Sequence, residues 1–328
     1  MHNRRIGPFT VSALGLGCMS MSQSYGAPDE AESERVLLGA LDEGYTFFDT
    51  AALYGFGHNE SLIGRVLGHR RAEFTLASKC GLFKDDQGRR KVDGRPEIIR
   101  KTCDESLQRL QTDVIDIYYL HRIDQNVPVE DSMGALSELV RAGKIRTIGL
   151  CEMSTATLRR AHAVHPVTVV QSEYSLWTRN PEHKVLPLCK ELGIAFVPYC
   201  PLGRGFLTGA VRDTGALGEK DLRLTMPRFQ GENFQANLGL LEDFEGIARA
   251  NGCTMAQLAL AWLLTRDETL VPIPGTKHVK YMKENARAAD IKLSVGDLQR
   301  LDQLINPDTV TGDRYDPDFA LTLDSEQE

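Results

Sequence analysis

The sequence predicts an α/β fold, a (β/α)8 TIM barrel, from two features that recur along its 328 residues. Short runs of apolar and β-branched residues alternate with longer amphipathic segments, which is the pattern of parallel βα units. Eight such runs can be distinguished, and eight strands with intervening helices close into a barrel. We expect the strands at Ser12–Gly17, Thr46–Asp49, Thr75–Lys79, Ile115–His121, Thr147–Cys151, Val169–Ser172, Ala195–Tyr199 and Thr269–Ile273.

The helices between these strands begin and end at recognisable residues. The segment Glu30–Glu43 is followed by Gly44, and Pro96–Leu110 has a proline in its first turn. Thr254 and Ser294 begin sequences that resemble capping boxes. These signals fall between the expected strands and therefore support the alternation.

Several stretches lie outside the simple repeat. Arg4–Phe9 and Val11–Leu14 could pair as a short N-terminal β-hairpin ahead of the barrel. Gly203–Phe234 and Pro307–Glu328 are too long for plain connections, and long loops or extra helices on a rigid scaffold usually carry substrate contacts. No break in composition marks a second domain, so we expect one barrel domain over residues 1–328.

The main alternative fold is an open, doubly wound sheet. That fold normally carries a dinucleotide-binding fingerprint after its first strand. Here the first strand leads into Gly15-Leu16-Gly17-Cys18-Met19-Ser20, which lacks the third glycine. The chain also has no GxxxxGK[ST] phosphate loop, so the closed barrel is favoured.

The composition excludes several classes of function. A net charge of −7 without blocks of like charge argues against nucleic acid as a partner. No apolar run approaches the roughly 18 residues of a membrane span, and the N-terminus lacks a secretory signal, so we expect a cytoplasmic protein with no membrane partner. The seven cysteines are dispersed with no CxxC pair, which is typical of reduced thiols. The histidines show no metal-ligand spacing, so no metal is expected.

Four polar residues follow or end three consecutive expected strands: Asp49, Tyr54, Lys79 and His121. The carboxyl ends of barrel strands face the active site, so we expect these side chains to meet there. An ammonium beside a phenol would stabilise the phenolate and lower the tyrosine pKa from its usual value of about 10. Asp49 would keep Lys79 charged, and His121 could orient a carbonyl oxygen or share the proton. The pattern therefore predicts a proton-transfer site.

These residues and the motifs around them resemble the aldo-keto reductases along most of the chain. The motifs occur in the order Asp49-Thr50-Ala51, Tyr54-Gly55, Asn59-Glu60, Ser78-Lys79, Tyr119-Leu120-His121, Gln171-Ser172-Glu173-Tyr174, Tyr199-Cys200-Pro201-Leu202-Gly203, Pro272-Ile273-Pro274-Gly275-Thr276 and Glu284-Asn285. The resemblance implies reduction of an aldehyde or ketone by NADPH. It implies that Tyr54 is the general acid, that Lys79 and Asp49 tune it, and that His121 positions the carbonyl.

A cofactor site is expected around Gly275-Thr276, ahead of a helix at Lys277–Ala288. Free backbone N–H groups at a helix start bind anions, and Lys277 adds positive charge there. The resemblance implies that Tyr199 stacks on the nicotinamide and that Gln171 bonds its carboxamide. The full set of expected cofactor residues is Cys151, Gln171, Tyr199, Pro201, Leu202, Gly203, Gly205, Gly275, Thr276, Lys277, Tyr281, Glu284 and Asn285.

The chain departs from the family pattern at three positions on the cofactor side. Tyr281 falls where many members have an arginine, so Lys277 with Tyr281 would contact the 2′-phosphate of NADPH. Cys151 and Cys200 stand where serine is common, and a thiol is a weaker hydrogen-bond partner than a hydroxyl.

Phe83 and Trp177 fall on expected rim loops, where they would either line an apolar substrate pocket or pack the loops. Two other functions stay open: a Schiff-base aldolase that uses Lys79 as its nucleophile, and a redox-sensing subunit that binds NADPH and turns over slowly. The expected partner is a small carbonyl compound. The sequence does not determine which compound, or whether the protein is a monomer or a homo-oligomer.

Overall fold

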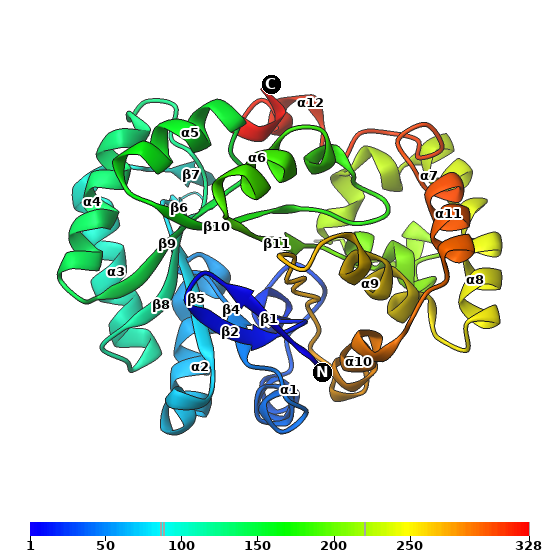
Figure 1. Ribbon diagram of the computed structural model, residues 1–328, viewed down its shortest axis with the longest axis horizontal. Coiled ribbons are helices and arrows are strands. Elements are labelled where there is room, and N and C mark those ends of the chain that lie inside the picture. The colour runs from blue at the N-terminus through cyan, green and yellow to red at the C-terminus, as the bar shows by residue number, and fades with distance from the viewer. Residues whose placement is uncertain (86, 88, 220, 328) are drawn as a thin grey trace.

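The computed structural model describes residues 1–85, 87, 89–219 and 221–327, and it is built around a parallel sheet of seven strands (Figure 1). The strand order across the sheet is β11-β10-β9-β8-β5-β4-β3. The strands are β3 (Leu16–Gly17), β4 (Phe47–Asp49), β5 (Thr75–Cys80), β8 (Ile115–Leu120), β9 (Ile145–Cys151), β10 (Val167–Glu173) and β11 (Ala195–Tyr199). The curled sheet with helices outside it is a nearly closed (β/α)8 barrel, as the sequence predicted.

The eighth position of the barrel is filled by a segment that is not a regular strand, which corrects the expectation for Thr269–Ile273. Its residues still bridge both edges of the sheet: Val271 N donates to Phe196 O at 2.9 Å, and Gly15 N donates to Pro272 O at 2.9 Å. Proline has no N–H, so Pro272 and Pro274 can only accept hydrogen bonds from the β3 side. Half of the ladder on the β3 side is therefore missing, and the barrel is nearly closed rather than fully paired.

A hairpin of β1 (Asn3–Ile6) and β2 (Phe9–Ser12) precedes the barrel. The expected first strand at Ser12–Gly17 is therefore wrong at its start, because Ser12 ends the hairpin and only Leu16 and Gly17 join the sheet. Ile6 and Val11 belong to the same apolar cluster as residues from inside the barrel, such as Val197. The hairpin thus packs against the interior of the barrel and completes its core.

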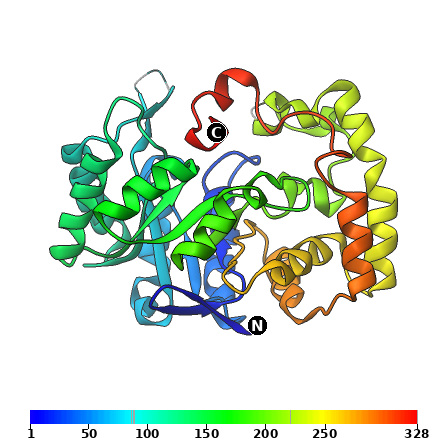
Figure 2. The ribbon, with the colours of Figure 1, turned by 45° about the horizontal axis from the view of Figure 1, so that its top comes forward.

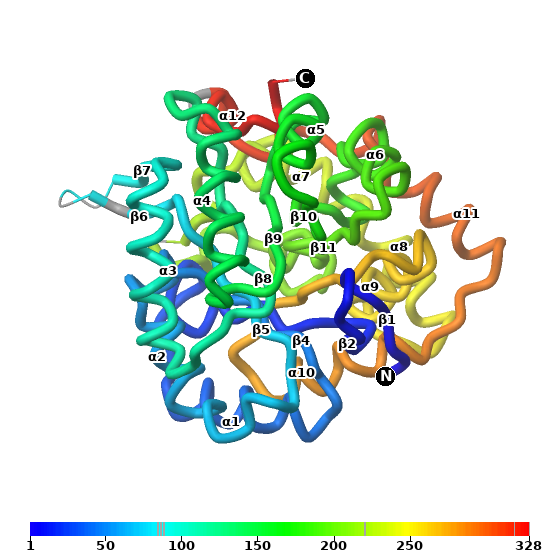
Figure 3. The backbone as a smooth tube through the Cα atoms, turned by 60° about the vertical axis from the view of Figure 1, so that its left-hand side comes forward, coloured from blue at the N-terminus to red at the C-terminus, as the bar shows by residue number. Residues whose placement is uncertain are grey.

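Helices surround the sheet and cover its outer face (Figures 1 and 3). Eight lie along the repeat: α1 (Glu30–Asp42), α2 (His58–Leu67), α3 (Pro96–Leu110), α4 (Val129–Arg141), α5 (Thr155–Val164), α6 (Val185–Leu192), α9 (Met255–Arg266) and α10 (Val279–Ala286). The capping box expected at Thr254 is present at the start of α9. A large apolar cluster between the sheet and these helices forms the second layer of the core.

The two long stretches and one shorter loop carry additional elements. The first long stretch leads into α7 (Gly231–Leu238) and α8 (Leu240–Ala250). After α11 (Val295–Leu304), the C-terminal segment with α12 (Pro317–Ala320) returns toward α5, as its red colour shows in Figures 1 and 2. The loop after β5 is a second hairpin, β6 (Leu82–Lys84) with β7 (Arg90–Val92), rather than irregular chain.

Helices long and apolar enough to cross a membrane are absent from the part of the chain that the structure describes.

Candidate active site

The strand register brings the expected proton-transfer residues to one end of the barrel. Asp49 is the last residue of β4, and it lies opposite Ala77 of the neighbouring β5. Lys79 follows two residues later in β5, opposite Tyr119 of β8, and His121 is the first residue beyond β8. Tyr54 begins a short 3-10 turn after β4. We call Asp49, Tyr54, Lys79 and His121 the tetrad.

The side chain of Lys79 is fully buried and connects the tetrad. Its Nζ donates to Asp49 Oδ1, to the carbonyl oxygen of Thr50 at 2.7 Å and to Tyr54 Oη at 3.4 Å. The second oxygen of Asp49 accepts a hydrogen bond of 2.8 Å from Gln171 Nε2. The rings of Tyr54 and His121 meet edge to face, with their centres 5.9 Å apart. Each member of the tetrad thus contacts another member, through a hydrogen bond of Lys79 or through the ring contact of Tyr54 and His121.

The electrostatics of the tetrad favour a charged lysine and a protonated tyrosine. Burial alone lowers the pKa of Lys79, but the Asp49 carboxylate and Tyr54 raise it above its ordinary value, so the side chain stays an ammonium. For Tyr54, burial raises the pKa and the charge of Lys79 lowers it, and the balance is a pKa of about 12. Lys79 therefore acts in the expected direction, but burial of the phenol outweighs it.

His121 is held as a neutral imidazole. Burial, followed by the positive charges of Arg122, Lys79 and Arg90, lowers the pKa of His121 well below its usual value. Its Nδ1 atom is buried and has no hydrogen-bond partner among the described residues. A neutral imidazole has one N–H to donate, which is what binding a carbonyl oxygen requires.

Buried polar residues fix the loop that carries Tyr54. Thr50 Oγ1 donates to Asn59 Oδ1 at 2.6 Å, and Asn59 Nδ2 donates to the carbonyl oxygen of Cys18 at 2.9 Å. The fully buried Glu60 accepts from Ser78 of β5 at 2.5 Å and from Arg109 of α3 at 2.7 Å. The motif residues Asn59, Glu60 and Ser78 therefore hold the tyrosine loop against the strands beside it.

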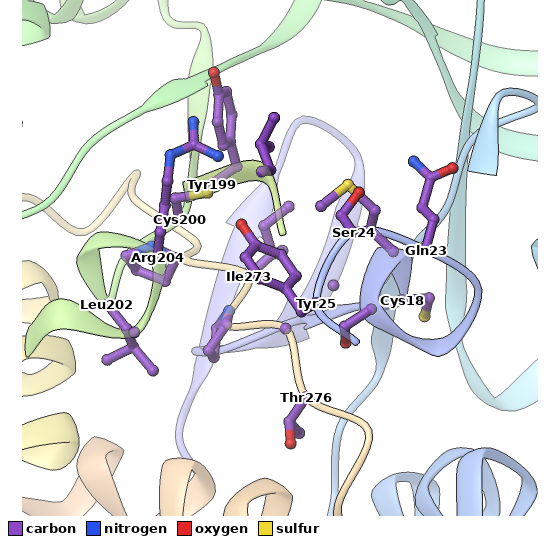
Figure 4. A pocket seen from close by; sticks show the side chains of 18 of the residues that line it. Cys18, Gln23, Ser24, Tyr25, Tyr199, Cys200, Leu202, Arg204, Ile273 and Thr276 are labelled. Carbon is purple, nitrogen blue, oxygen red and sulfur yellow. The ribbon is translucent and has the colours of Figure 1, made fainter. Parts of the chain in front are cut away.

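A cavity of about 600 Å³ lies over the tetrad, and the exposed edges of Asp49, Tyr54 and His121 form part of its wall. Figure 4 shows it surrounded by side chains from the loop after β3, the loop after β11 and the segment after Ile273. Of the expected cofactor residues, those that line it are Gln171, Tyr199, Pro201, Leu202, Gly205, Gly275, Thr276, Lys277, Tyr281, Glu284 and Asn285. Lys79, Cys151 and Gly203 lie behind this wall.

Some of the expected cofactor residues have protein partners. Lys277 Nζ donates to the carbonyl oxygens of Tyr25 at 2.9 Å and Ala27 at 2.7 Å, and it thereby holds the loop after β3 beside the cavity. The helix expected from Lys277 begins at Val279, whose N–H donates to a carboxylate oxygen of Glu32 at 3.1 Å. Tyr281 is 47% exposed at the cavity edge.

The cavity wall also contains side chains that the sequence analysis did not select: Tyr25, Arg90, Arg122, Arg204, Arg223, Tyr315 and Phe319. Two of these residues could have been selected from the sequence, because Arg122 directly follows His121 and Arg204 lies inside the expected cofactor loop. Tyr315 and Phe319 come from the C-terminal segment, whose path could not be inferred from local patterns.

Neither of the two aromatic residues expected near the substrate is part of the cavity wall. Trp177 is buried and stacks on Phe206 with ring centres 4.1 Å apart, while Phe229 meets it edge to face at 5.2 Å. Phe83 is 40% exposed on β6. Trp177 thus follows the loop-packing alternative.

Groups of three or more His, Cys, Asp or Glu side chains that could hold a metal ion do not occur among the described residues. All seven cysteines are free thiols.

Comparisons with known proteins over the whole chain point to one family. The model of the aldo/keto reductase family matches residues 13–306. The chain is 46% identical to the aldo-keto reductase yakc [NADP(+)] of Schizosaccharomyces pombe over 96% of its length and 94% of the relative's. It is 44% identical to the probable aldo-keto reductase 1 of Glycine max, over 94% of this chain and 89% of that one.

Solved structures with the same fold lead to the same family. The glycerol dehydrogenase AKR11B4 of Gluconobacter oxydans superposes with a TM-score of 0.86 at 28% identity, covering 96% of this chain and 98% of the other. An aldo/keto reductase of Klebsiella pneumoniae, solved with NADP and acetate, has a TM-score of 0.74 at 29% identity over 96% and 98% of the two chains. The chain belongs to the aldo/keto reductase family.

Proposed function

We propose that this protein reduces an aldehyde or ketone to an alcohol with NADPH, and that Tyr54 supplies the proton. The observation that carries the proposal is the contact between Lys79 Nζ and Tyr54 Oη at 3.4 Å, which puts a buried ammonium beside the one phenol of the tetrad that faces the cavity. A positioned acid contributes about 10²–10⁴-fold to a rate. The activity is assigned to a single barrel domain spanning residues 1–328.

The proposal of NADPH as cofactor is supported by relatives and by the cavity. The yeast relative is named as an NADP(+) enzyme, and structures from Klebsiella pneumoniae contain NADP or NADPH. Lys277 on the cavity wall offers positive charge to a phosphate group, and no carboxylate among the described side chains pairs with it. A Cβ on Gly275 would lie 3.2 Å from the backbone oxygen of Gly17, so a larger residue there would be tightly packed against the neighbouring backbone.

Further residues of the wall suit an extended polar ligand. Ser20 Oγ is buried without a hydrogen-bond partner among the described residues, and it lies on the wall of the cavity. In our proposal Gly275, Thr276, Lys277, Tyr281 and Asn285 hold the adenosine end, and Tyr199 and Gln171 hold the nicotinamide end. When bound, NADPH supplies the hydride for the carbonyl carbon.

The chain's own residues then bind, orient and protonate the carbonyl. The neutral imidazole of His121 donates a hydrogen bond to the carbonyl oxygen, and Tyr54 transfers its proton to that oxygen. The ammonium of Lys79 stabilises the phenolate that remains, and Asp49 keeps Lys79 charged and in place. Gln171 fixes the second oxygen of Asp49, so the carboxylate cannot rotate away.

The aldolase alternative receives no support from the contacts of Lys79. A Schiff-base nucleophile must be a neutral amine with a free path to the substrate. Lys79 is instead a charged ammonium with three hydrogen-bond acceptors, and it lies behind the cavity wall.

The test is NADPH oxidation with a panel of aldehydes and ketones, comparing wild type with Tyr54→Phe. We expect turnover to fall by about 10²–10⁴-fold in the variant, because the acid is removed. Binding of NADPH, followed by its fluorescence, should persist. Tyr118→Phe is the matched control, because it removes the phenol oxygen of a buried tyrosine that does not line the cavity.

Two results would contradict the proposal. Undiminished turnover in Tyr54→Phe would remove this residue as the acid. NADPH binding without turnover of any carbonyl compound would favour the redox-sensing alternative over a reductase.

A further inference from the structure

Arg122, which directly follows His121, and Arg90 line the same cavity. Arg122 Nη1 donates to the carbonyl oxygen of His121 at 2.6 Å, and this is the hydrogen bond that the described structure gives its guanidinium. Arg90, at the start of β7, lies on the cavity wall with its guanidinium carbon 5.5 Å from the ring centre of Phe319. Among the side chains that the structure describes, none forms an ion pair with either arginine.

The other arginines of this cavity are compensated. Arg204 pairs with Glu173 at 2.6 Å, and Arg223 pairs with Asp221 at 2.7 Å. Arg89, the immediate neighbour of Arg90, pairs with Asp85 at 2.9 Å. Among the described side chains, Arg90 and Arg122 therefore differ from the other arginines of the cavity in having no ion pair.

The acidic side chains of the cavity wall cannot neutralise these two arginines. Asp49 is bound to Lys79 and Gln171, and Glu284 accepts a hydrogen bond of 2.7 Å from Thr254 Oγ1 at the opposite, cofactor side of the cavity. Burial lowers the pKa of Arg122, but Tyr199 and the buried carboxylate of Glu152 raise it above its ordinary value, so Arg122 stays charged. Glu152 forms no described ion pair with Arg122, so the guanidinium can still bind an incoming anion. Burial is the main cause that lowers the pKa of His121, and the positive charges of Arg122, Lys79 and Arg90 lower it further.

We propose that Arg122, assisted by Arg90, binds a carboxylate carried by the substrate, so that the enzyme prefers carbonyl compounds with a carboxylate over matched neutral ones. This inference rests on the proposed function, because His121 must bind the carbonyl. A guanidinium has five N–H donors, and Arg122 uses one of them within the chain. The remaining donors form a fork that matches the two oxygens of a carboxylate.

The wall between the arginines and the tetrad suits a short carbon skeleton. Leu53 and Leu82 line it from the loops after β4 and β5, and Tyr315 and Phe319 line it from the C-terminal segment. Apolar contacts there would hold the carbon atoms while the two ends of the substrate meet His121 and Arg122.

The test compares matched acid and ester substrates. We would measure kcat/KM with NADPH for 4-formylbenzoate and its methyl ester, and for succinic semialdehyde and its methyl ester. Wild type should favour each acid over its ester by about tenfold or more, since only the carboxylate can form charge-assisted hydrogen bonds with the guanidinium. In Arg122→Met the ratio of kcat/KM for the acid to kcat/KM for the ester should fall toward one, mainly because KM for the acid rises. Arg90→Gln should lower the ratio by a smaller factor, and Arg122→Lys should keep part of it.

Arg89→Gln is the control in the same hairpin, because it removes an exposed arginine that already has a partner. It should leave the ratio at the wild-type value. Arg90 is exposed, so Arg90→Gln keeps the test valid even where Arg122→Met folds poorly.

A readout without turnover separates this inference from the proposed function. Benzoate binding to the NADP⁺-loaded protein, measured by calorimetry, should weaken by about tenfold in Arg122→Met. Equal kcat/KM for acid and ester in wild type would overturn the carboxylate preference while leaving carbonyl reduction intact. If no carbonyl compound is reduced, the proposed function fails. Benzoate binding that is equally strong in wild type and Arg122→Met would overturn the anion site, whether or not the protein reduces carbonyl compounds.

Discussion

Two buried groups of ions lie at the carboxyl ends of the barrel strands, and they differ in where their cations come from. In the tetrad, Asp49 and Lys79 both belong to strands of the sheet. In the second group, Glu152 follows β9 and Glu173 ends β10, but the cations are Arg204 from the loop after β11 and Arg314 from the C-terminal segment. We call Glu152, Glu173, Arg204 and Arg314 the rim cluster.

The rim cluster fastens loops to the barrel. Arg314 Nη2 pairs with Glu152 at 2.5 Å, and Arg204 pairs with Glu173 at 2.6 Å. Arg204 also donates to Tyr315 Oη at 2.7 Å. Glu152 and Arg204 both have positive φ angles, of 51° and 56°, which are uncommon for residues with a side chain. Strained backbone of this kind persists only where surrounding contacts determine it.

The comparison teaches that the same chemistry serves two purposes. A cation on a strand is held in place by the rigid sheet, so it can tune the pKa of a reacting group beside it. A cation on a loop gains its position from the ion pair, so the pair determines where the loop lies. Tyr315 and Phe319, which line the cavity, depend on the second arrangement.

The largest expected effect is in the tetrad. Lys79→Met should lower turnover by about 10²–10⁴-fold, because the phenolate of Tyr54 loses its ammonium. The variant should also be less stable by about 3–5 kcal/mol, since Asp49 is left as an unpaired buried charge. The double variant Asp49→Asn with Lys79→Met should regain stability in urea unfolding without regaining turnover. Recovery of turnover in the double variant would show that the pair acts only as structure.

A smaller effect on turnover and a clear effect on structure are expected at the rim cluster. Arg314→Met leaves Glu152 without its main partner and should destabilise the protein by about 3–5 kcal/mol. Limited proteolysis should then cleave within residues 307–328, which Arg314 joins to the barrel. Adding Glu152→Gln should restore most of the stability but not the protection. A C-terminal segment that stays protected in Arg314→Met would mean that other contacts hold it.

The smallest expected effect is in the pH profile. The pKa of His121 is well below its usual value, so the imidazole stays neutral from high pH down past about 6.5. Tyr54, with a pKa of about 12, stays protonated over the same range. The value of kcat/KM for a neutral aldehyde should therefore be flat between about pH 6.5 and 9. A loss of rate near pH 6.5 on acidification would contradict the neutral state of His121.

Local pattern was enough to find elements whose residues interact with near neighbours. The strand Ala195–Tyr199 and the helix Pro96–Leu110 have the expected bounds, because a short apolar run and a proline at a helix start are local signals. The segment Thr269–Ile273 has the same apolar character but is not a regular strand, and Pro272 within it and Pro274 just beyond it have no N–H to donate toward β3. Trp177 shows the limit for side chains, because an aromatic residue on a loop has no local signal for what it packs against.

The sequence by itself determined the order of the strands and therefore the meeting of Asp49, Lys79 and His121, because parallel neighbours bring their carboxyl ends together. Only the tertiary structure decided which arginines found carboxylate partners. Arg204 pairs with Glu173 across 31 positions that include α6 and β11, and Arg314 pairs with Glu152 across 162 positions. Arg122 and Arg90 pair with no carboxylate among the side chains that the structure describes. Pairing over such distances depends on the paths of loops and of the C-terminal segment, and these paths cannot be predicted from a periodic pattern in the sequence.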